Sequence, residues 1–253
     1  MVTMIQSVQR AAQILRHVAD HPRIQATEIA QHVGLSGPTA HHLLSTLVQE
    51  GLLRKDSRRS YELGPAAEHI ADSTLRQMRP SAELREALNE LAAETGESCY
   101  LTQWRGDQIR VVAVVEGAHA VRVSGLVVGY AANIHARVGA RVMLAFADAE
   151  LREWALAGYD YVAVTPHTLR SRRELDDELE RIRATSIALD REQLQIGVYS
   201  ASAPVRTEAG VVAALSLTAP VERFAAHEDQ YLAMLRRCAE LPIRSTGAPG
   251  VPE

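Results

Sequence analysis

The chain has 253 residues, of which 47% are hydrophobic and 23% charged, a composition typical of a folded protein with one large domain or two small ones. No apolar run approaches the ~18–20 residues that a membrane-spanning helix needs, and the N-terminus has no apolar signal core, so we expect a cytoplasmic protein with no membrane partner. The formal net charge of −4 excludes a chain that is cationic over its whole surface.

Residues 7–19 have the periodicity of an amphipathic helix, which Ser7 can cap and which His21 and Pro22 end. Its expected apolar face consists of Val8, Ala11, Ala12, Leu15 and Val18. We therefore expect this helix to form one wall of a small N-terminal core.

Residues 27–51 predict two helices that flank a short turn. Thr27 can cap the first helix, Gly34 can take the left-handed conformation at its end, and Ser36 can cap the second. The exposed start of the second helix offers small and polar residues, namely Ser36, Gly37, Thr39, His41, His42 and Ser45. Such a surface suits a helix that enters a DNA major groove, although a helical hairpin in an ordinary core has the same pattern.

The residues after this pair of helices favour the DNA-binding alternative. Residues 52–56 and 60–63 are strand-like runs, and the polar stretch between them carries Arg58 and Arg59. A hairpin with a cationic tip directly after the second helix is typical of a winged helix-turn-helix, because the wing lies along phosphates. Residues 1–64 carry seven basic and five acidic residues, a net charge of +2, which leaves −6 for the rest of the chain. A basic head on an acidic body agrees with DNA binding by the head.

The expected DNA contacts fall into two groups. The candidates for the major groove are Ser36, Thr39, His41 and His42, and the candidates for phosphates and the minor groove are Arg10, Arg54, Lys55, Arg58 and Arg59. Adjacent residues point about 100° apart on a helix, so we expect only one of the two histidines to face DNA. The same divergence makes the pair a poor metal chelate, and we expect no metal site. The alternatives are a histidine that only packs and wing arginines that are only solvated.

Residues 65–77 predict a further helix, which ends at residues 78–80 and could join two domains or pack against its copy in a dimer. Beyond it, helical patterns cover residues 81–95, 135–147, 148–156, 171–185 and 228–241. Strand-like patterns cover residues 98–104, 108–116, 120–124, 187–190, 195–203 and 211–218, the last being apolar enough for a central strand. We therefore predict an α+β fold with a mainly antiparallel sheet and flanking helices. The expected domains are a head of residues 1–64, a linker helix of residues 65–79, a body of residues 80–245 and a disordered tail of residues 246–253.

Hydroxyl-bearing residues mark the expected binding site of the body. Ser200, Ser216 and Thr218 place hydroxyls on otherwise apolar strands, the last two at period two on one face. Buried hydroxyls need partners, which can be a ligand, the backbone or water. Backbone N–H groups at the start of the 135–147 helix can hold an anion. The side chains of Tyr100, Tyr130, His135 and Arg137 could line the same cavity.

The sequence carries none of the common catalytic motifs: GxSxG, a P-loop, a Rossmann glycine set or HExxH. Cys99 and Cys238 lie far apart and fit no metal or redox spacing, so we expect free thiols. We expect neither catalytic residues nor a cofactor, although His135 and Ser200 could be imagined as a dyad. The alternative function is a small-molecule enzyme or sensor whose head serves only for assembly.

The order of these parts resembles the IclR family of bacterial transcriptional regulators over nearly the whole chain. The matching stretches are SVQRAAQILRHVADHP, TEIAQHVGLSGPTAHHLLSTLVQEGLL, YELGP, LAAETGES, IHARVGARVMLAF, GVYSASAPV and GVVAALSLTAP. The resemblance implies a winged helix-turn-helix head and a GAF-like body that binds a small effector, often an aromatic or organic acid, and forms dimers or dimers of dimers. It points to the effector-binding residues Gly139, Ala140, Asp190, Val198, Ser200, Ser216 and Thr218. The expected function is a transcriptional regulator that binds a double-stranded DNA operator under the control of an effector.

The chain departs from the family pattern at three places. The family usually has a Lys near Gly37 and an Arg near His42, so the reading helix lacks both cations here. The helix that commonly reads HATA(S/L)GKA has Arg137 in place of a small residue and Arg141 in place of the Lys, and Ser200 replaces a common Cys. Neither the operator sequence nor the usual effector can therefore be carried over. More of the DNA affinity is expected from residues 54–59 and from dimerisation.

Overall fold

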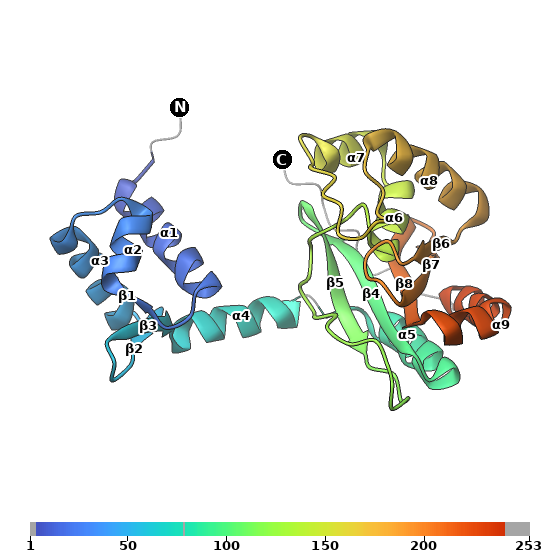
Figure 1. The fold of residues 1–253 in the computed structure, drawn as a ribbon, viewed down its shortest axis with the longest axis horizontal. Coiled ribbons are helices and arrows are strands. Elements are labelled where there is room, and N and C mark those ends of the chain that lie inside the picture. Colours follow the sequence, from blue (N-terminus) through green and yellow to red (C-terminus); the bar gives the residue numbers. More distant parts are fainter. Residues whose placement is uncertain (1–3, 78, 241–253) are drawn as a thin grey trace. The chain divides into compact units, whose positions relative to one another are not determined.

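The computed structural model describes residues 4–77 and 79–240, which form two compact units divided between residues 77 and 78 (Figure 1). The first unit combines helices with a small three-stranded sheet, and the second has a five-stranded sheet with helices on both faces. The predicted α+β class is confirmed. The predicted tail of residues 246–253 lies outside the described residues.

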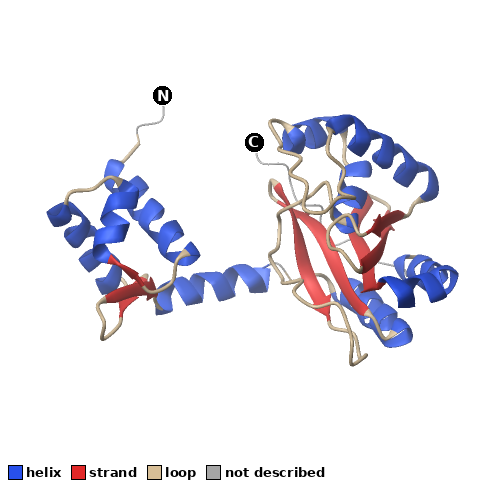
Figure 2. Ribbon diagram, viewed as in Figure 1, coloured by secondary structure: helices blue, strands red, loops and turns tan. Residues whose placement is uncertain are grey.

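The first unit is built from three helices, a hairpin and a long final helix (Figure 2). Its elements are α1 (Gln6–Asp20), β1 (Ile24–Gln25), α2 (Ala26–Val33), α3 (Gly37–Gln49), β2 (Leu53–Lys55), β3 (Ser60–Leu63) and α4 (Pro65–Gln77). The sheet order is β1-β3-β2 with antiparallel neighbours, so the β2–β3 hairpin forms the predicted wing and β1 extends it. The predicted linker helix, α4, belongs to this unit.

The core of the first unit closes around Ile14, Val18 and Ile29, which are fully buried. The predicted apolar face of the first helix is wrong at Val8, which is 63% exposed, because the buried stripe runs through Ile14 and Val18. The predicted cap is also wrong, since α1 includes Ser7 and no side chain caps its start.

The predicted cap of α2 at Thr27 is wrong as well. α2 begins at Ala26, because the Gln25 N–H donates to the Glu28 carboxylate at 3.0 Å and holds the first turn. The Gln25 side-chain amide donates to the Ser60 hydroxyl at 2.8 Å. The start of α2 is thereby tied to the wing.

Gly64 fixes the junction between the wing and α4. A Cβ atom at this position would lie 2.8 Å from the Leu53 carbonyl oxygen, closer than side chains tolerate. The Gly64 N–H donates to the Leu52 carbonyl and the Ala66 N–H to the Gly51 carbonyl, both at 2.9 Å. The start of α4 is therefore hydrogen-bonded to the residues that lead into the wing.

The second unit has one antiparallel sheet of order β5-β4-β8-β7-β6. Its elements are α5 (Ala82–Thr95), β4 (Ser98–Arg105), β5 (Gln108–Val115), α6 (Val138–Ala145), α7 (Ala149–Leu156), α8 (Arg172–Thr185), β6 (Ala188–Arg191), β7 (Val198–Thr207), β8 (Gly210–Pro220) and α9 (Val221–Ala239). β8 occupies the middle of the sheet, as its apolar sequence predicts. Helices α5 and α9 cover one face, and α6 and α8 lie on the other (Figure 1).

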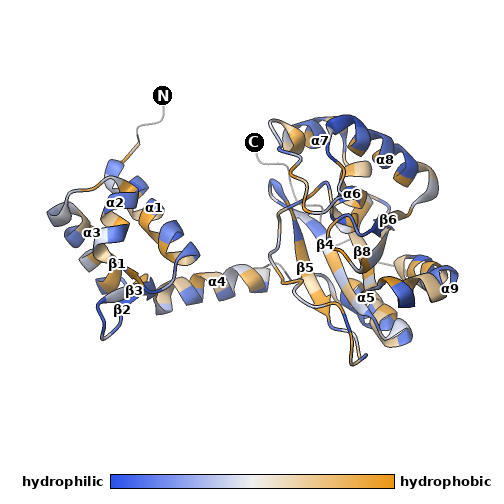
Figure 3. Ribbon diagram, in the orientation of Figure 1, coloured by the Kyte–Doolittle hydropathy of each residue, from blue (hydrophilic) through white to orange (hydrophobic). Residues whose placement is uncertain are grey.

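The alternation of β4 sorts its side chains between the two helical layers. Cys99 and Leu101 enter the core beneath α5 and α9, whereas Tyr100 and Trp104 enter the core beneath α6 and α8. α8 is mostly hydrophilic in Figure 3, because its buried side chains lie on one face of a strongly charged helix. Each face of the sheet thus has its own core.

Three predicted elements of the second unit need correction. Residues 120–124 form no strand, because side chains hold this segment: Ser98 Oγ donates to the Val123 carbonyl at 2.7 Å, and the Arg223 guanidinium donates to the Val121 carbonyl at 2.9 Å. The last helix starts at Val221 rather than residue 228, with a break in its helical geometry further along. The helix predicted from residue 135 starts at residue 138.

Candidate DNA-binding surface and effector cavity

The start of α3 presents a polar surface on a fixed backbone. Ser36 is the N-cap: its hydroxyl accepts from the Thr39 N–H at 3.4 Å and lies 2.8 Å from the Thr39 hydroxyl. Ser36, His41 and His42 are exposed, and Thr39 is half-buried. The two imidazoles both reach solvent, with ring centroids 6.4 Å apart in edge-to-face geometry. That only one of them faces DNA stays a prediction. Residues 36–42 thus offer hydrogen-bonding groups without a lysine or arginine.

The tip of the wing is held by Asp56. Its carboxylate accepts from the Arg58 N–H at 2.9 Å and from the Ser60 N–H at 2.8 Å, while Arg59 takes a left-handed conformation with a φ of 63°. The Arg58 and Arg59 side chains are exposed, and neither forms an ion pair with any described residue. The tip therefore projects two uncompensated cations from a hydrogen-bonded turn.

The other predicted phosphate contacts are less available. Arg54 pairs with Glu62 at 2.9 Å, and the Lys55 ammonium lies 5.3 Å from the centre of the Tyr61 ring. Arg10 is half-buried on α1. The net cationic charge of the wing is therefore concentrated at its tip.

A cavity of about 280 Å³ opens in the second unit, beside the strands that carry the predicted hydroxyls. Its lining residues are Tyr100, Val123, Ser124, Gly125, Leu126, Tyr130, Asn133, Asp190, Leu194, Gln195, Val198, Ser200 and Thr218. Of the predicted effector-binding residues, this cavity brings together Tyr100, Tyr130, Asp190, Val198, Ser200 and Thr218. The residues that do not line it are Gly139, Ala140, Ser216, His135 and Arg137. The wall thus combines β4, β6, β7 and β8 with the segment between β5 and α6.

The strand hydroxyls bond to one another across the sheet. Ser200 Oγ donates to Thr218 Oγ1 at 3.0 Å on the cavity wall. Ser216 Oγ donates to Ser202 Oγ at 2.8 Å, which in turn donates to the Leu215 carbonyl at 3.0 Å. Ser216 is therefore satisfied inside the sheet, whereas Ser200 and Thr218 keep acceptor capacity at the cavity.

Gly139 allows α6 to pack closely on the sheet. A Cβ atom there would lie 2.5 Å from the Thr102 hydroxyl oxygen and 3.1 Å from the Ser216 hydroxyl oxygen. Gly139 and the adjacent Ala140 are both buried, and neither contributes to the cavity wall. The small residues at the start of this helix therefore serve close packing in this structure.

Asp190 is the ionisable carboxyl of the cavity wall. Burial raises its pKa to about 6, although the nearby Arg141 guanidinium and the backbone N–H groups of Gln193 and Leu194 oppose this shift. The Gln193 N–H donates to its carboxylate at 2.5 Å. This carboxyl therefore changes its protonation state just below neutral pH, inside the cavity.

Arg141 is a functional neighbour that the sequence did not single out as a site. It is fully buried and donates to the Gln193 side-chain oxygen at 2.7 Å, to the Leu189 carbonyl at 2.9 Å and to the Glu178 carboxylate at 3.4 Å. Burial lowers the pKa of Arg141, and the charges of Asp190 and Glu178 oppose that shift. It thus holds the strand end that carries Asp190. The signals in the sequence were a charged residue on an otherwise apolar helix and its place where the family commonly has a Lys.

Arg137 is fully buried behind the cavity wall. Its guanidinium donates to the Ala132 carbonyl at 2.8 Å and to the Ile109 carbonyl at 2.9 Å, and lies 5.2 Å from the centre of the Tyr130 ring. Burial lowers its pKa. Arg137 therefore positions the Tyr130 segment rather than entering the cavity.

His135 is also buried outside the cavity. Its Nε2 lies 3.2 Å from the Val162 carbonyl, which can only accept, so this nitrogen carries the proton and Nδ1 accepts from the Tyr159 hydroxyl at 2.7 Å. Burial lowers the pKa of His135. The imidazole is thus neutral and occupied by partners of the protein itself, with no contact to Ser200 that would support a dyad.

Comparison with known protein families decides the identity. The model of the IclR helix-turn-helix domain matches residues 7–57, and the model described as bacterial transcriptional regulator IclR C-terminal matches residues 73–243. The chain belongs to the IclR family of bacterial transcriptional regulators. An IclR-type regulator binds DNA through its helix-turn-helix, and neither matching model describes a catalytic family.

Individual IclR-type proteins resemble the chain over nearly its full length. The HTH-type transcriptional regulator XynR of Escherichia coli K12 is 32% identical over 92% of this chain and 92% of its own. A transcriptional regulator from Rhodococcus sp. RHA1 superimposes with a TM-score of 0.75 at 24% identity, over 93% and 96% of the two chains. An IclR homologue from Microbacterium hydrocarbonoxydans, solved in complex with 4-hydroxybenzoate, superimposes with a TM-score of 0.72 at 21% identity, over 92% and 96%. The similarity to these two solved structures, at 24% and 21% identity, shows the fold alone.

Across residues 4–77 and 79–240, no helix has both the length and the apolar character that crossing a membrane demands.

Proposed function

We propose that the chain is an IclR-type regulator whose DNA binding is controlled by a small organic acid held in the cavity of about 280 Å³. The observation that carries the proposal is the convergence of Tyr100, Asp190, Ser200 and Thr218 from four different strands on one cavity. Polar groups that converge in a concave, partly apolar pocket are the usual features of a small-molecule site.

The chemistry of the wall supports an acid with an apolar or aromatic body. Tyrosine rings and aliphatic side chains such as Leu126 and Val198 form the apolar part, and Tyr130 and Asn133 supply donors. A ligand carboxylate next to Asp190 would favour the protonated form of Asp190, whose pKa is already raised to about 6. Binding of an acid would then take up a proton at neutral pH. The solved complex of an IclR homologue with 4-hydroxybenzoate agrees with this ligand class.

The proposed DNA contacts divide between base edges and phosphates. Exposed Ser36, His41 and His42, with the half-buried Thr39, would face the major groove, since α3 presents them at its start. Arg58 and Arg59 would contact phosphates or the minor groove from the wing tip. Flanking contributions are assigned to Arg10, Arg54 and Lys55. The lack of a cation in the first turn of α3 means that the wing contributes most of the electrostatic affinity.

Assembly is proposed to involve α4. Ile70 and Leu75 expose 56% and 43% of their surface on this helix, although both are large apolar residues. Pairing of α4 with its copy would bury them and place two reading helices on the two halves of a palindrome-like operator. We therefore propose a homodimer or a dimer of dimers.

Gel shift with the DNA upstream of its own gene, across a salt series, tests the first half of the proposal. Saturable binding that weakens with salt is expected, and the absence of saturable binding would refute it. For the second half, 4-hydroxybenzoate, benzoate and pyruvate serve as probes in thermal-shift and gel-shift titrations. Thr218→Val should weaken binding of the active probe, whereas Ser216→Ala, beside it but outside the cavity wall, should not. Equal losses in both variants would place the effector elsewhere.

A further inference from the structure

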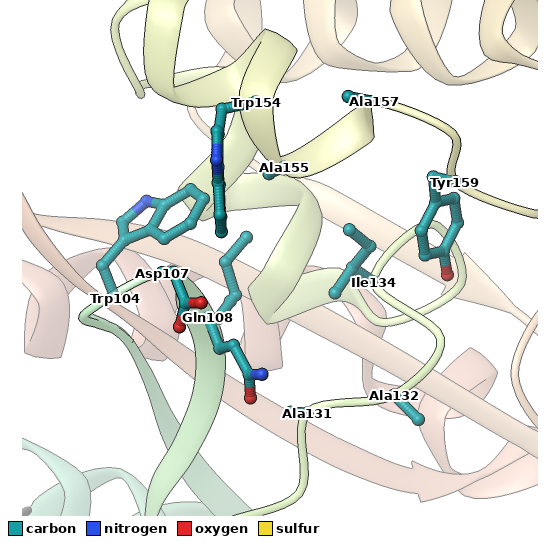
Figure 4. Close-up of a pocket in the computed structure, with 11 residues that line it drawn as sticks. Trp104, Asp107, Gln108, Ala131, Ala132, Ile134, Trp154, Ala155, Ala157 and Tyr159 are labelled. Carbon is teal, nitrogen blue, oxygen red and sulfur yellow. The ribbon is translucent and has the colours of Figure 1, made fainter. Parts of the chain in front are cut away.

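A second and larger pocket of about 530 Å³ lies in the second unit. It is bounded by the β4–β5 turn, by α7 and by the segment before α6, and none of its lining residues belongs to the effector cavity. Trp104 and Trp154, which are the only tryptophans of the 253-residue chain, both line it. Figure 4 shows their indoles on the same side of the pocket, one reaching in from β4 and the other from α7.

Trp154 leaves 54% of its surface exposed although it is the largest side chain of its helix. Trp104 is almost fully buried, and its neighbours Ile109 and Ile134 form an apolar floor. Both indoles line the pocket, and the exposed Trp154 leaves aromatic surface available to a small molecule. The pocket therefore has an aromatic end that no contact within the second unit fills.

The charge at this aromatic end is negative. Asp107, on the β4–β5 turn, lines the pocket, is exposed, and forms no hydrogen bond or ion pair with the described part of the chain. The neighbouring Arg105 points to the opposite face of β4 from Trp104, because side chains alternate along a strand, and it donates to Gln103 on that face at 2.7 Å. Asp107 is thus the carboxylic acid that lines the pocket together with the two indoles, and no lysine, arginine or histidine is among the lining residues.

Gln108 sits beside Asp107 but is already engaged. Its side-chain oxygen accepts from the Arg110 guanidinium, whose other nitrogen donates to the Gly129 carbonyl at 2.9 Å. Arg110 is therefore held by hydrogen bonds to Gln108 and to the Gly129 carbonyl. The carboxylate of Asp107 remains the group with unused hydrogen-bonding and charge capacity.

Electron-rich indole faces next to an unpaired carboxylate attract a positive charge, and quaternary or alkylated ammonium groups are the ligands that such aromatic sites recognise. We infer that this pocket binds a small organic ammonium ion, whose charged head lies between Trp104 and Trp154 and whose counter-charge is Asp107. The site is separate from the effector cavity, and its chemistry is of opposite sign to the acid proposed there. The inference therefore stands whether or not that proposal holds.

Intrinsic fluorescence of the full-length protein tests the inference directly, because both tryptophans line this pocket. The probes are choline and its neutral isostere 3,3-dimethylbutan-1-ol, titrated at constant ionic strength. Choline should change the emission saturably and bind at least tenfold more tightly than the isostere. Equal binding of the two probes, or no saturation by choline up to about 50 mM, would overturn the inference.

Single substitutions test which residues recognise the positive charge of choline. Asp107→Asn should weaken choline binding about fivefold and leave the isostere unaffected, whereas Trp154→Leu should weaken choline about tenfold. Asp177→Asn removes an exposed acid of α8 outside the pocket and is the matched control, expected to change nothing. Both lining positions are exposed, so the fold should persist, which circular dichroism checks.

A second copy of the chain is the competing occupant of an exposed tryptophan pocket. Light scattering of the wild type and of Trp154→Leu separates the two possibilities. An unchanged mass together with weaker choline binding supports the ammonium site. A fall in mass on substitution, with no choline binding by the wild type, would show that the pocket is an interface between copies and would overturn the inference.

Discussion

The two units use polar side chains in opposite ways. In the first unit, Ser36, His41 and Arg58 project into solvent from elements whose own cores are apolar. In the second unit, Asp190, Arg141 and other polar groups are buried and bonded to one another around a cavity. An extended partner such as DNA is met by an exposed surface, whereas a small ligand must be enclosed. Substitutions should therefore affect binding in the first unit and stability in the second.

The largest effect is expected for Arg141→Met. The substitution removes the buried cation that pairs with Glu178 and lies near Asp190, and it leaves Glu178 only its exposed partner Arg181. Removing one member of a buried ion pair typically costs about 3–5 kcal/mol in the free energy of unfolding. Urea denaturation followed by tryptophan fluorescence measures this loss. Arg181→Ala, which removes the exposed partner of the same Glu178, should cost less than about 1 kcal/mol. A similar loss of unfolding free energy in both variants would contradict the idea that the buried arginine contributes more stability than the exposed one.

The next effect concerns the pH dependence of stability through Asp190. Its pKa is raised from 3.8 to about 6 by folding, so the folded state binds the proton more tightly than the unfolded state does. The contribution of Asp190 to the unfolding free energy is fully present below pH 3.8 and is lost as the pH rises through 6. The total loss is on the order of 2–3 kcal/mol. Asp190→Asn should remove this contribution and flatten the curve of unfolding free energy between pH 4 and pH 7. An unchanged slope in the variant would show that other groups dominate this range.

A smaller effect is expected for alanine at two helix-start glycines, one in each unit. Gly139→Ala puts a Cβ atom 2.5 Å from the Thr102 hydroxyl oxygen, and such overpacking costs about 1–3 kcal/mol. Gly37→Ala meets no atom within 4 Å and should be neutral or slightly stabilising, because alanine favours helix. Thermal denaturation of the two variants compares them. A destabilised Gly37→Ala would show that the start of α3 is less open than its exposure indicates.

The smallest effect on stability, with a specific effect on binding, is expected for the Arg58→Ala/Arg59→Ala double variant. Both side chains are exposed and outside the core, so the unfolding free energy should stay within about 0.5 kcal/mol. Loss of two phosphate contacts should weaken binding to all DNA sequences and lower the salt slope by about two. Fluorescence anisotropy of DNA binding across a salt series measures the affinity and its salt slope. Arg173→Ala, which removes one exposed arginine on α8 in the other unit, is the control for loss of positive charge away from the wing.

The structural features that the sequence predicted correctly depend on residues that are close together in the chain. Ser36 caps α3, Gly34 ends α2 in the left-handed conformation, and apolar β8 lies at the centre of the sheet, because these features are decided within a few residues. The caps predicted at Ser7 and Thr27 are wrong. The period-two spacing of Ser216 and Thr218 placed them correctly on one face of β8, although only Thr218 reaches the cavity.

The remaining features depend on contacts between distant segments. Residues 120–124 have a strand-like composition, but side chains of Ser98 and Arg223 take up their carbonyls. The burial of Arg141 depends on α8 and β6, which supply its partners Glu178 and Leu189. Trp104 and Trp154 are fifty residues apart, and nothing local indicates that they share a pocket. Contacts of this kind can be predicted only when the whole fold is known.

The close junction at Gly64 has a consequence for operator architecture. Because α4 starts from backbone hydrogen bonds to the residues that lead into the wing, its direction is set by the same rigid body that carries α3. If two copies of α4 pair, the separation of the two reading helices becomes a property of the first unit. The number of base pairs between half-sites would then be encoded in residues 4–77, and the effector would alter occupancy of the operator without altering its spacing.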